Sequence, residues 1–166
     1  MAWKLMFLIF AAVAVSSLGD HCPMMFTEVP CTGSCIKFLL QPNSYEGHSD
    51  ACKKNHGGQL ASIHSQSAND YIRGLTLFFG LRTKDIVIGA KSDKDGKFHW
   101  VDGSKFNYNN WEDGQPGEEV QKCVQMNGFR NDTKKMGKWR TFDCEKTVVS
   151  ALCEVKADLS AREIEC

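Results

Sequence analysis

Two patterns of hydrophobic and polar positions divide the chain. Apolar residues recur with helical spacing over residues 44–55 and again from about residue 66 to 75. Ser44 can cap the first helix and Gly57-Gly58 can end it, while Ser65 or Ser67 can cap the second. From residue 85 onward the apolar residues form short β-branched runs, which favour strands. The pattern therefore predicts two helices followed mainly by strands.

The predicted strands are short and separated by turn residues. Ile86–Ile88 and Phe98–Val101 flank Asp95-Gly96, a strong hairpin signal. Residues 22–41 suggest a small hairpin that precedes the helices, and the three remaining predicted strands cover 122–126, 138–142 and 150–155. Helices first and strands afterwards indicate an α+β domain with antiparallel sheets.

The first segment has the features of a secretory signal. Lys4 is followed by eleven apolar residues, Leu5–Val15, which are too few to span about 30 Å of hydrocarbon as a helix. We predict cleavage after Gly19, so that residues 1–19 form the signal peptide. We expect residues 20–156 to form one domain and 157–166 a polar C-terminal tail ending in a cysteine. No second long apolar run follows, so we expect a secreted, extracellular protein without a membrane span.

Composition narrows the class of protein further. Twenty basic and twenty acidic side chains cancel in 166 residues, which gives no general reason to expect a nucleic-acid partner. An even number of cysteines in a secreted chain indicates disulfides. The eight cysteines are Cys22, Cys31, Cys35, Cys52, Cys123, Cys144, Cys153 and Cys166.

Motifs for catalysis are weak. Gly47–Ala51 loosely matches a nucleophile elbow, but it falls inside the first predicted helix rather than on a strand-to-helix turn. The histidines lack zinc-ligand spacing, and there is no glycine-rich phosphate loop. Asp93–Gly96 is best explained as a hairpin turn. We therefore expect no enzymatic activity. Asn131, in Asn131-Asp132-Thr133, is a predicted N-glycosylation acceptor.

Several segments, in order, resemble the C-type lectin-like domain family. The resemblance covers residues 22–155, nearly all of the chain after the predicted signal. It implies a fold of two helices, small antiparallel sheets and a long ligand loop. The matching segments are Gly33–Phe38, Cys52 with Gly57–Ile63, Val87–Ala90, Trp100–Ser104, Tyr108, Trp111, Gln115–Gly117, Cys123, Trp139, Cys144 and Cys153-Glu154.

The resemblance also implies a disulfide pattern. Family members pair the cysteines that correspond to Cys52–Cys153 and Cys123–Cys144. An extra N-terminal hairpin usually carries its own bridge, here Cys22–Cys35, which leaves Cys31 and Cys166 as a pair. Cys22–Cys31 with Cys35–Cys166 is a competing arrangement that the sequence leaves open.

The resemblance places a calcium-dependent sugar site at the long loop, but its ligands are depleted here. Lectin members use a Glu-Pro-Asn or Gln-Pro-Asp triplet, a later Glu and an Asn-Asp pair after the tryptophan. In this chain Gly117 lacks a side-chain oxygen, and Arg140 and Thr141 replace the Asn-Asp pair. Gln115 and Glu119 are the remaining metal candidates. We therefore expect no cofactor and little or no calcium binding.

The loop still offers groups that can recognise a ligand. We expect Trp100 and Trp111 to fill the core beneath it, and we expect a glycan or an extracellular protein as partner. The alternative is a calcium-independent protein-recognition module, or a structural surface or matrix module, of the same fold. The predicted ligand-binding residues are Gln115, Glu118, Glu119, Tyr108, Asn110 and Arg140.

Overall fold

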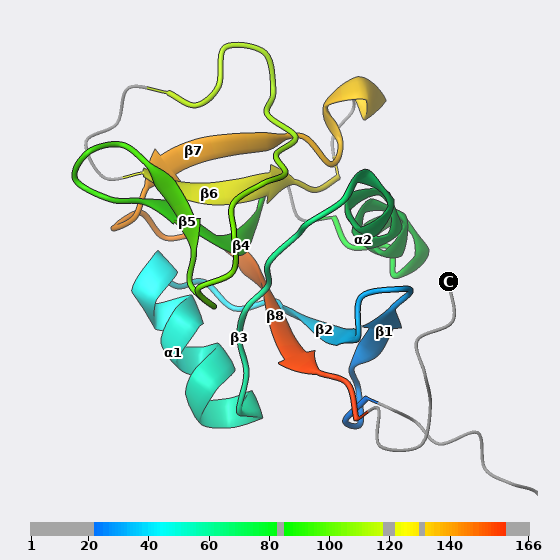
Figure 1. The fold of residues 1–166 in the computed structure, drawn as a ribbon. Helices are drawn as coiled ribbons and strands as arrows, with labels where there is room; N and C mark the ends of the chain where they lie inside the picture. Colours follow the sequence, from blue (N-terminus) through cyan, green and yellow to red (C-terminus); the bar gives the residue numbers. More distant parts are fainter. Residues whose placement is uncertain (1–21, 83–84, 118–121, 130–131, 159–166) are drawn as a thin grey trace, which may run out of the picture.

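The computed structural model describes residues 22–82, 85–117, 122–129 and 132–158 (Figure 1). The predicted signal peptide lies outside these ranges. No helix in the described part is both long and apolar enough to cross a membrane. The elements are β1 (Thr27–Val29), β2 (Ser34–Leu39), α1 (Tyr45–His56), β3 (Gln59–Leu60), α2 (Gln66–Phe78), β4 (Asp85–Ser92), β5 (Phe98–Trp100), β6 (Lys122–Asn127), the short 3-10 helix η1 (Thr133–Lys135), β7 (Trp139–Asp143) and β8 (Ser150–Lys156).

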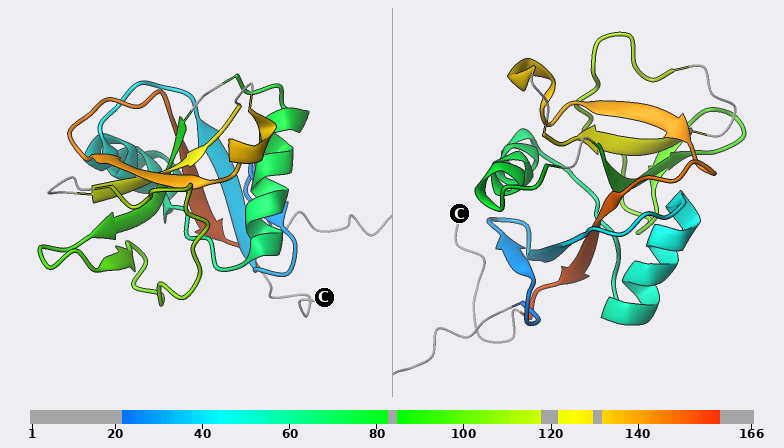
Figure 2. Two further views of the ribbon diagram at one scale, coloured as in Figure 1. Left: turned by 90° about the horizontal axis from the view of Figure 1, so that it is seen from above. Right: turned by 180° about the vertical axis from the view of Figure 1, so that it is seen from behind.

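The strands join into one mixed sheet rather than separate antiparallel sheets. Its order is β1-β2-β8-β4-β6-β7, with β3 paired to β8 and β5 paired to β4. The β4–β8 pair is parallel, with Ile86 opposite Ser150, which corrects the expectation of antiparallel pairing throughout. The chain between β4 and β8 is long enough to bring β8 back in the same direction, and a parallel pair requires such a crossover. Figures 1 and 2 show α1 and α2 on opposite sides of β2 and β8.

Local signals set the bounds of α1 as predicted. The Ser44 hydroxyl accepts a hydrogen bond from the Gly47 amide at 3.2 Å, and Gly57 ends the helix in the left-handed conformation. The elbow-like motif lies within this helix. Its His48 is buried and its Nε2 lies 2.9 Å from the Val148 carbonyl oxygen, so it is a packed residue of the core. Burial lowers the pKa of His48.

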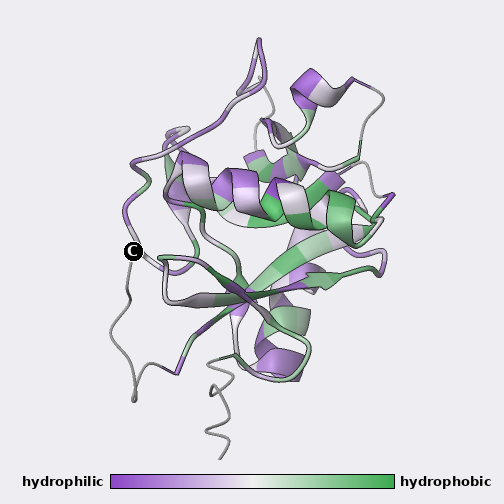
Figure 3. Cartoon of the chain, turned by 90° about the vertical axis from the view of Figure 1, so that its right-hand side faces the viewer, coloured by the Kyte–Doolittle hydropathy of each residue, from purple (hydrophilic) through white to green (hydrophobic). Residues whose placement is uncertain are grey.

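In α2 the cap is Ser65, whose hydroxyl accepts from the Ala68 amide at 3.2 Å. The helix buries Ile72 as expected, but it also buries Asn69, while Tyr71 and Leu75 are only partly buried. Figure 3 shows α2 crossing the front of the molecule with both hydrophilic and hydrophobic residues in view, and the last turn of the helix exposes Leu77 and Phe78. The buried Asn69 contacts Trp139 of β7, which lies beneath the long loop.

Gly89 lies in Val87–Ala90, one of the segments that resemble the family, and two backbone segments approach each other closely there. Gly89 of β4 lies under β3, and a Cβ there would come within 2.5 Å of the Leu60 carbonyl oxygen. The Gly89 amide donates to the Ala61 carbonyl at 2.8 Å, which holds the two segments together. Any larger residue would push β3 away from the core.

Three disulfides cross-link the described residues. They are Cys22–Cys35, Cys52–Cys153 and Cys123–Cys144, as the resemblance implied. Cys22 thus pairs with Cys35 and not with Cys31, which is exposed and has no disulfide partner within the described residues. Cys166 lies outside the described residues.

Candidate ligand-binding site

The long loop that follows β5, residues 101–117 of the described part, packs on a cluster of aromatic rings. Trp139 of β7 is fully buried at its centre. The rings of Trp100, Tyr108 and Trp111 meet it edge to face, with centroids 5.7, 5.5 and 5.9 Å away. Trp100 is buried and Trp111 is partly buried against the core, in line with the expectation for both. The loop is therefore held on a rigid apolar platform.

Hydrogen bonds of asparagine side chains tie this platform to α2. The Trp139 indole donates to Asn69 Oδ1 at 2.8 Å, and Asn69 Nδ2 donates to the Gly137 carbonyl oxygen at 3.1 Å. Asn110 of the loop donates to the same carbonyl oxygen at 2.9 Å. Sequence reasoning missed Asn69. Its only signal was its position three residues before Ile72, on the buried face of a helix.

Asn110 itself is engaged at both ends of its amide. While Nδ2 binds Gly137, Oδ1 accepts a hydrogen bond from Lys138 Nζ at 2.9 Å. Asn110 therefore shapes the loop and holds a lysine ammonium beside it. A ligand would meet the Asn110–Lys138 pair together rather than a free amide.

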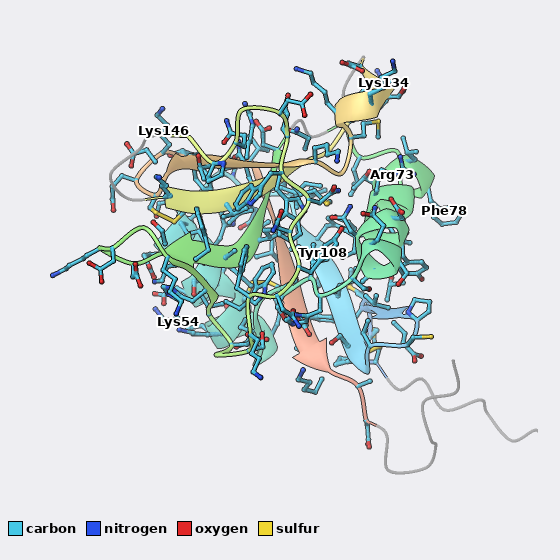
Figure 4. All side chains as sticks on the ribbon, turned by 45° about the horizontal axis from the view of Figure 1, so that its top comes forward. Lys54, Arg73, Phe78, Tyr108, Lys134 and Lys146 are labelled. Carbon is cyan, nitrogen blue, oxygen red and sulfur yellow. A yellow bond between two sulfur atoms is a disulfide. The ribbon has the colours of Figure 1, made fainter. Side chains whose placement is uncertain are left out.

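Tyr108 lies between the platform and α2. Its hydroxyl donates to Gln66 Oε1 at 3.1 Å, and Figure 4 labels it on the loop in front of the sheet. Burial, followed by the nearby charge of Asp70, raises the pKa of Tyr108 to about 12, so the phenol stays neutral at physiological pH. Asn107 and Asn109 on either side of it are exposed. One half-buried ring thus lies between two exposed amides.

The Gln115 amide oxygen is occupied by donors from the protein itself. The Gln115–Pro116 peptide bond is cis. Gln115 Oε1 accepts from the Thr141 amide at 2.8 Å, the Thr141 hydroxyl at 3.0 Å and the Gly117 amide at 3.2 Å. An oxygen that already accepts three hydrogen bonds is a poor calcium ligand, because its lone pairs are used.

Arg140 does not join this group. Successive residues of a strand point to opposite faces, so Arg140 points away from the face on which Thr141 meets Gln115. The Arg140 guanidinium instead forms an ion pair with Asp85 of β4, with Nη2 2.6 Å from Oδ1. This contact ties β7 to β4 across the intervening strand β6.

The remaining predicted residues fall outside the described ranges. Glu118, Glu119 and the predicted glycosylation site Asn131 are among them. Within residues 22–82, 85–117, 122–129 and 132–158, no three His, Cys, Asp or Glu side chains gather in a way that could hold a metal ion. Of the two predicted metal candidates, Gln115 lies within the described ranges with its oxygen already occupied, and Glu119 lies outside them.

A carboxylate outside the predicted ligand-binding set, Glu112, lies at the other side of the loop. Glu112 accepts a hydrogen bond from Asn127 Nδ2 at 2.9 Å and pairs with Lys135 Nζ at 2.8 Å. The Glu112 amide also donates to the Trp139 carbonyl oxygen at 2.8 Å. The bond from Lys135, then that from Asn127, lowers the pKa of Glu112. These contacts close the loop over β7.

The ion pair of Glu112 should make the free energy of unfolding depend on pH. Because its pKa is lower in the folded protein, its ion pair stabilises the fold at neutral pH. That contribution should be lost as the pH falls from about 4.3, the ordinary value, through the folded-state pKa. We expect Glu112→Gln to lower the free energy of unfolding at pH 7 and to flatten its decline in acid, as measured by urea unfolding from pH 7 to 3. Lys135→Met should act in the same direction, and an unchanged pH slope in both variants would contradict this role.

Comparison with known proteins places the chain in a family. The C-type lectin domain model matches residues 41–155. The chain is 32% identical over 151 residues to CD302 antigen of Mus musculus, covering 89% of this chain and 63% of that protein. It is also 32% identical over 136 residues to the galactose-specific lectin nattectin of Thalassophryne nattereri, covering 78% of this chain and 82% of nattectin.

A solved structure agrees with this match. The Ca²⁺-independent C-type lectin SPL-2 from Saxidomus purpuratus superposes with a TM-score of 0.71 at 26% identity, covering 85% of this chain and 96% of that one. The chain belongs to the C-type lectin domain family and has its carbohydrate-recognition fold. It spans less than two thirds of the length of CD302.

Proposed function

We propose that this chain is an extracellular recognition protein that binds glycans on the long loop without calcium. The binding surface is centred on Tyr108, with the exposed Asn107 and Asn109 and the Asn110–Lys138 pair beside it. An aromatic face offers stacking to the apolar side of a sugar ring, and the surrounding amides and ammonium offer donors and acceptors to its hydroxyls.

The observation that carries the calcium-independent part is the state of Gln115. Its side-chain oxygen accepts two hydrogen bonds from Thr141 and one from Gly117. These bonds fix the loop at the position where lectin members of the family bind calcium. The loop thus has an internal substitute for the metal. SPL-2, which is similar in fold and sequence, is described as a Ca²⁺-independent C-type lectin, and this supports calcium independence here.

The extracellular setting rests on chemistry as well. Three disulfides in the described residues are typical of proteins that fold in an oxidising compartment. The predicted signal peptide at residues 1–19 would deliver the chain there. Nattectin is named a galactose-specific lectin, so galactose-terminated glycans are the first class to test.

A glycan array probed with the purified protein, with and without a calcium chelator, tests the proposal. We expect binding that the chelator does not reduce. Loss of all binding on chelation would overturn the calcium-independent mechanism. The absence of any bound glycan, with and without the chelator, would overturn glycan binding and favour a protein-recognition or structural module of the same fold.

Matched variants locate the surface. Asn107→Ala with Asn109→Ala removes two exposed amides and should weaken binding about fivefold or more, since each ligand hydrogen bond contributes about 0.5–1.5 kcal/mol. Lys54→Ala changes an exposed residue of α1 away from the loop and should bind as the parent does. Equal binding by the two variants would place the glycan elsewhere.

A further inference from the structure

A cavity of about 330 Å³ lies between the β1–β2 hairpin, the start of α2 and β8. None of its lining residues belongs to the surface proposed for glycans, although the lining residue His64 contacts Ser104 at 3.2 Å and the ring of Trp100 beneath the long loop. Its apolar lining comes from Val29, Ile36, Ala68 and Ile72. These side chains are themselves buried and belong to the main core, so the cavity is an opening onto the core.

The same cavity contains a buried carboxylate. Glu154 of β8 is 4% exposed and accepts hydrogen bonds from the Ser34 hydroxyl and from the Ser62 amide, the latter at 2.9 Å. Its ion pair to Lys156 Nζ is long, at 3.9 Å, and that lysine is largely in solvent. A buried charge with only a distant cation is costly, so a cation placed in the cavity would be stabilising.

Cys31, which has no disulfide partner among the described residues, lies at this cavity, and the chain returns toward it after β8. Cys31 lines the cavity and is exposed. The Ala157 amide donates to the Gly33 carbonyl oxygen at 2.9 Å, two residues from Cys31. Cys166 lies eight positions after Asp158 in the sequence, an extended reach of about 26 Å. Cys166 can therefore return to Cys31 by a path over the cavity.

The composition of residues 159–166 matches what the cavity lacks. Leu159, Ala161 and Ile164 are apolar, Arg162 is a cation, and Cys166 carries the second unassigned thiol. We propose that residues 159–166 dock in this cavity and that Cys166 forms a disulfide with Cys31. Apolar side chains would cover the apolar lining, and Arg162 would approach Glu154.

The covalent step is a two-thiol oxidation. The thiols of Cys31 and Cys166 lose two protons and two electrons to a disulfide oxidant such as oxidised glutathione, and one S–S bond forms. The inference does not depend on the proposed glycan binding, because the cavity and the long loop share no residue.

The disulfide is tested on the full chain expressed through an oxidising secretory pathway. The unreduced protein is treated with iodoacetamide, and its peptides are mapped by mass spectrometry. We expect no adduct on Cys31 and a cross-linked peptide pair that contains Cys31 and Cys166 in the monomer. An adduct on Cys31, or a Cys31 bridge between two chains, would overturn the pairing.

Docking is tested separately, with the disulfide removed. In Cys166→Ser the Cys31 thiol is free, and a docked segment should still shield it. We expect it to react with iodoacetamide about tenfold more slowly than in the triple variant Cys166→Ser, Ile164→Ser, Arg162→Glu, as for a site that opens a minor fraction of the time. Equal rates would overturn docking, and the three disulfides remain intact in both proteins.

Discussion

Trp139→Ala is expected to destabilise the protein by about 3–5 kcal/mol, the range for removing a large buried ring. Trp139 is fully buried, and its ring supports Trp100, Tyr108 and Trp111. The loop would lose its platform, so ligand binding should fall together with stability. Equilibrium unfolding in urea measures the first effect, and the glycan array measures the second.

A pair of phenylalanine variants separates ring packing from hydrogen bonding. The Trp139 indole donates to Asn69, whereas the buried Trp100 indole has no partner within the described residues. Trp139→Phe should therefore cost about 1–3 kcal/mol more than Trp100→Phe, because it leaves the buried Asn69 oxygen unsatisfied. Equal losses would mean that the Asn69 bond contributes nothing to the platform.

Removal of the Cys52–Cys153 bridge should have an effect of similar size. The two cysteines lie 101 residues apart in sequence, and both are fully buried. In the chain-entropy model a loop of this length restricts the unfolded chain by about 4–5 kcal/mol. The bridge also joins α1 to β8, so we expect Cys52→Ala with Cys153→Ala to unfold at much lower urea concentration.

The Cys22–Cys35 bridge is the matched control. It closes only 13 residues, so its removal should cost about 3 kcal/mol in the same model. The prediction is thus a difference between two double-alanine variants, measured under one set of conditions. A loss at Cys22–Cys35 as large as that at Cys52–Cys153 would count against the loop-length explanation.

Much of the fold could be predicted because its signals are local. Ser44 and Gly57 set the bounds of α1 through bonds to residues within one or two turns. Asp95-Gly96 sets the β4–β5 hairpin, whose register pairs Ala90 with Trp100. The resemblance to C-type lectins then implied the pairing of distant cysteines, which helix and strand patterns alone could not supply.

The contacts around the candidate site could be predicted less well than the fold. The sequence singled out Gln115, Tyr108 and Asn110, and the structure brings Tyr108 and Asn110 to the same aromatic platform. It also grouped Arg140 with them, although Arg140 pairs with Asp85 across the sheet. Neighbours in sequence within a strand point to opposite faces, and only the register of β7 decides which face meets the loop.

The sequence by itself determined the caps, the hairpin turns and the depleted set of calcium ligands, since each depends on residue type and short spacing. Only the tertiary structure decided that the Trp139 indole donates to Asn69, that the Gln115 side-chain oxygen accepts a hydrogen bond from Thr141, and that β4 lies parallel to β8. Those contacts join residues 26 to 70 positions apart. A hydrogen bond at that range depends on where the packed core places both partners, which neither partner's local sequence encodes.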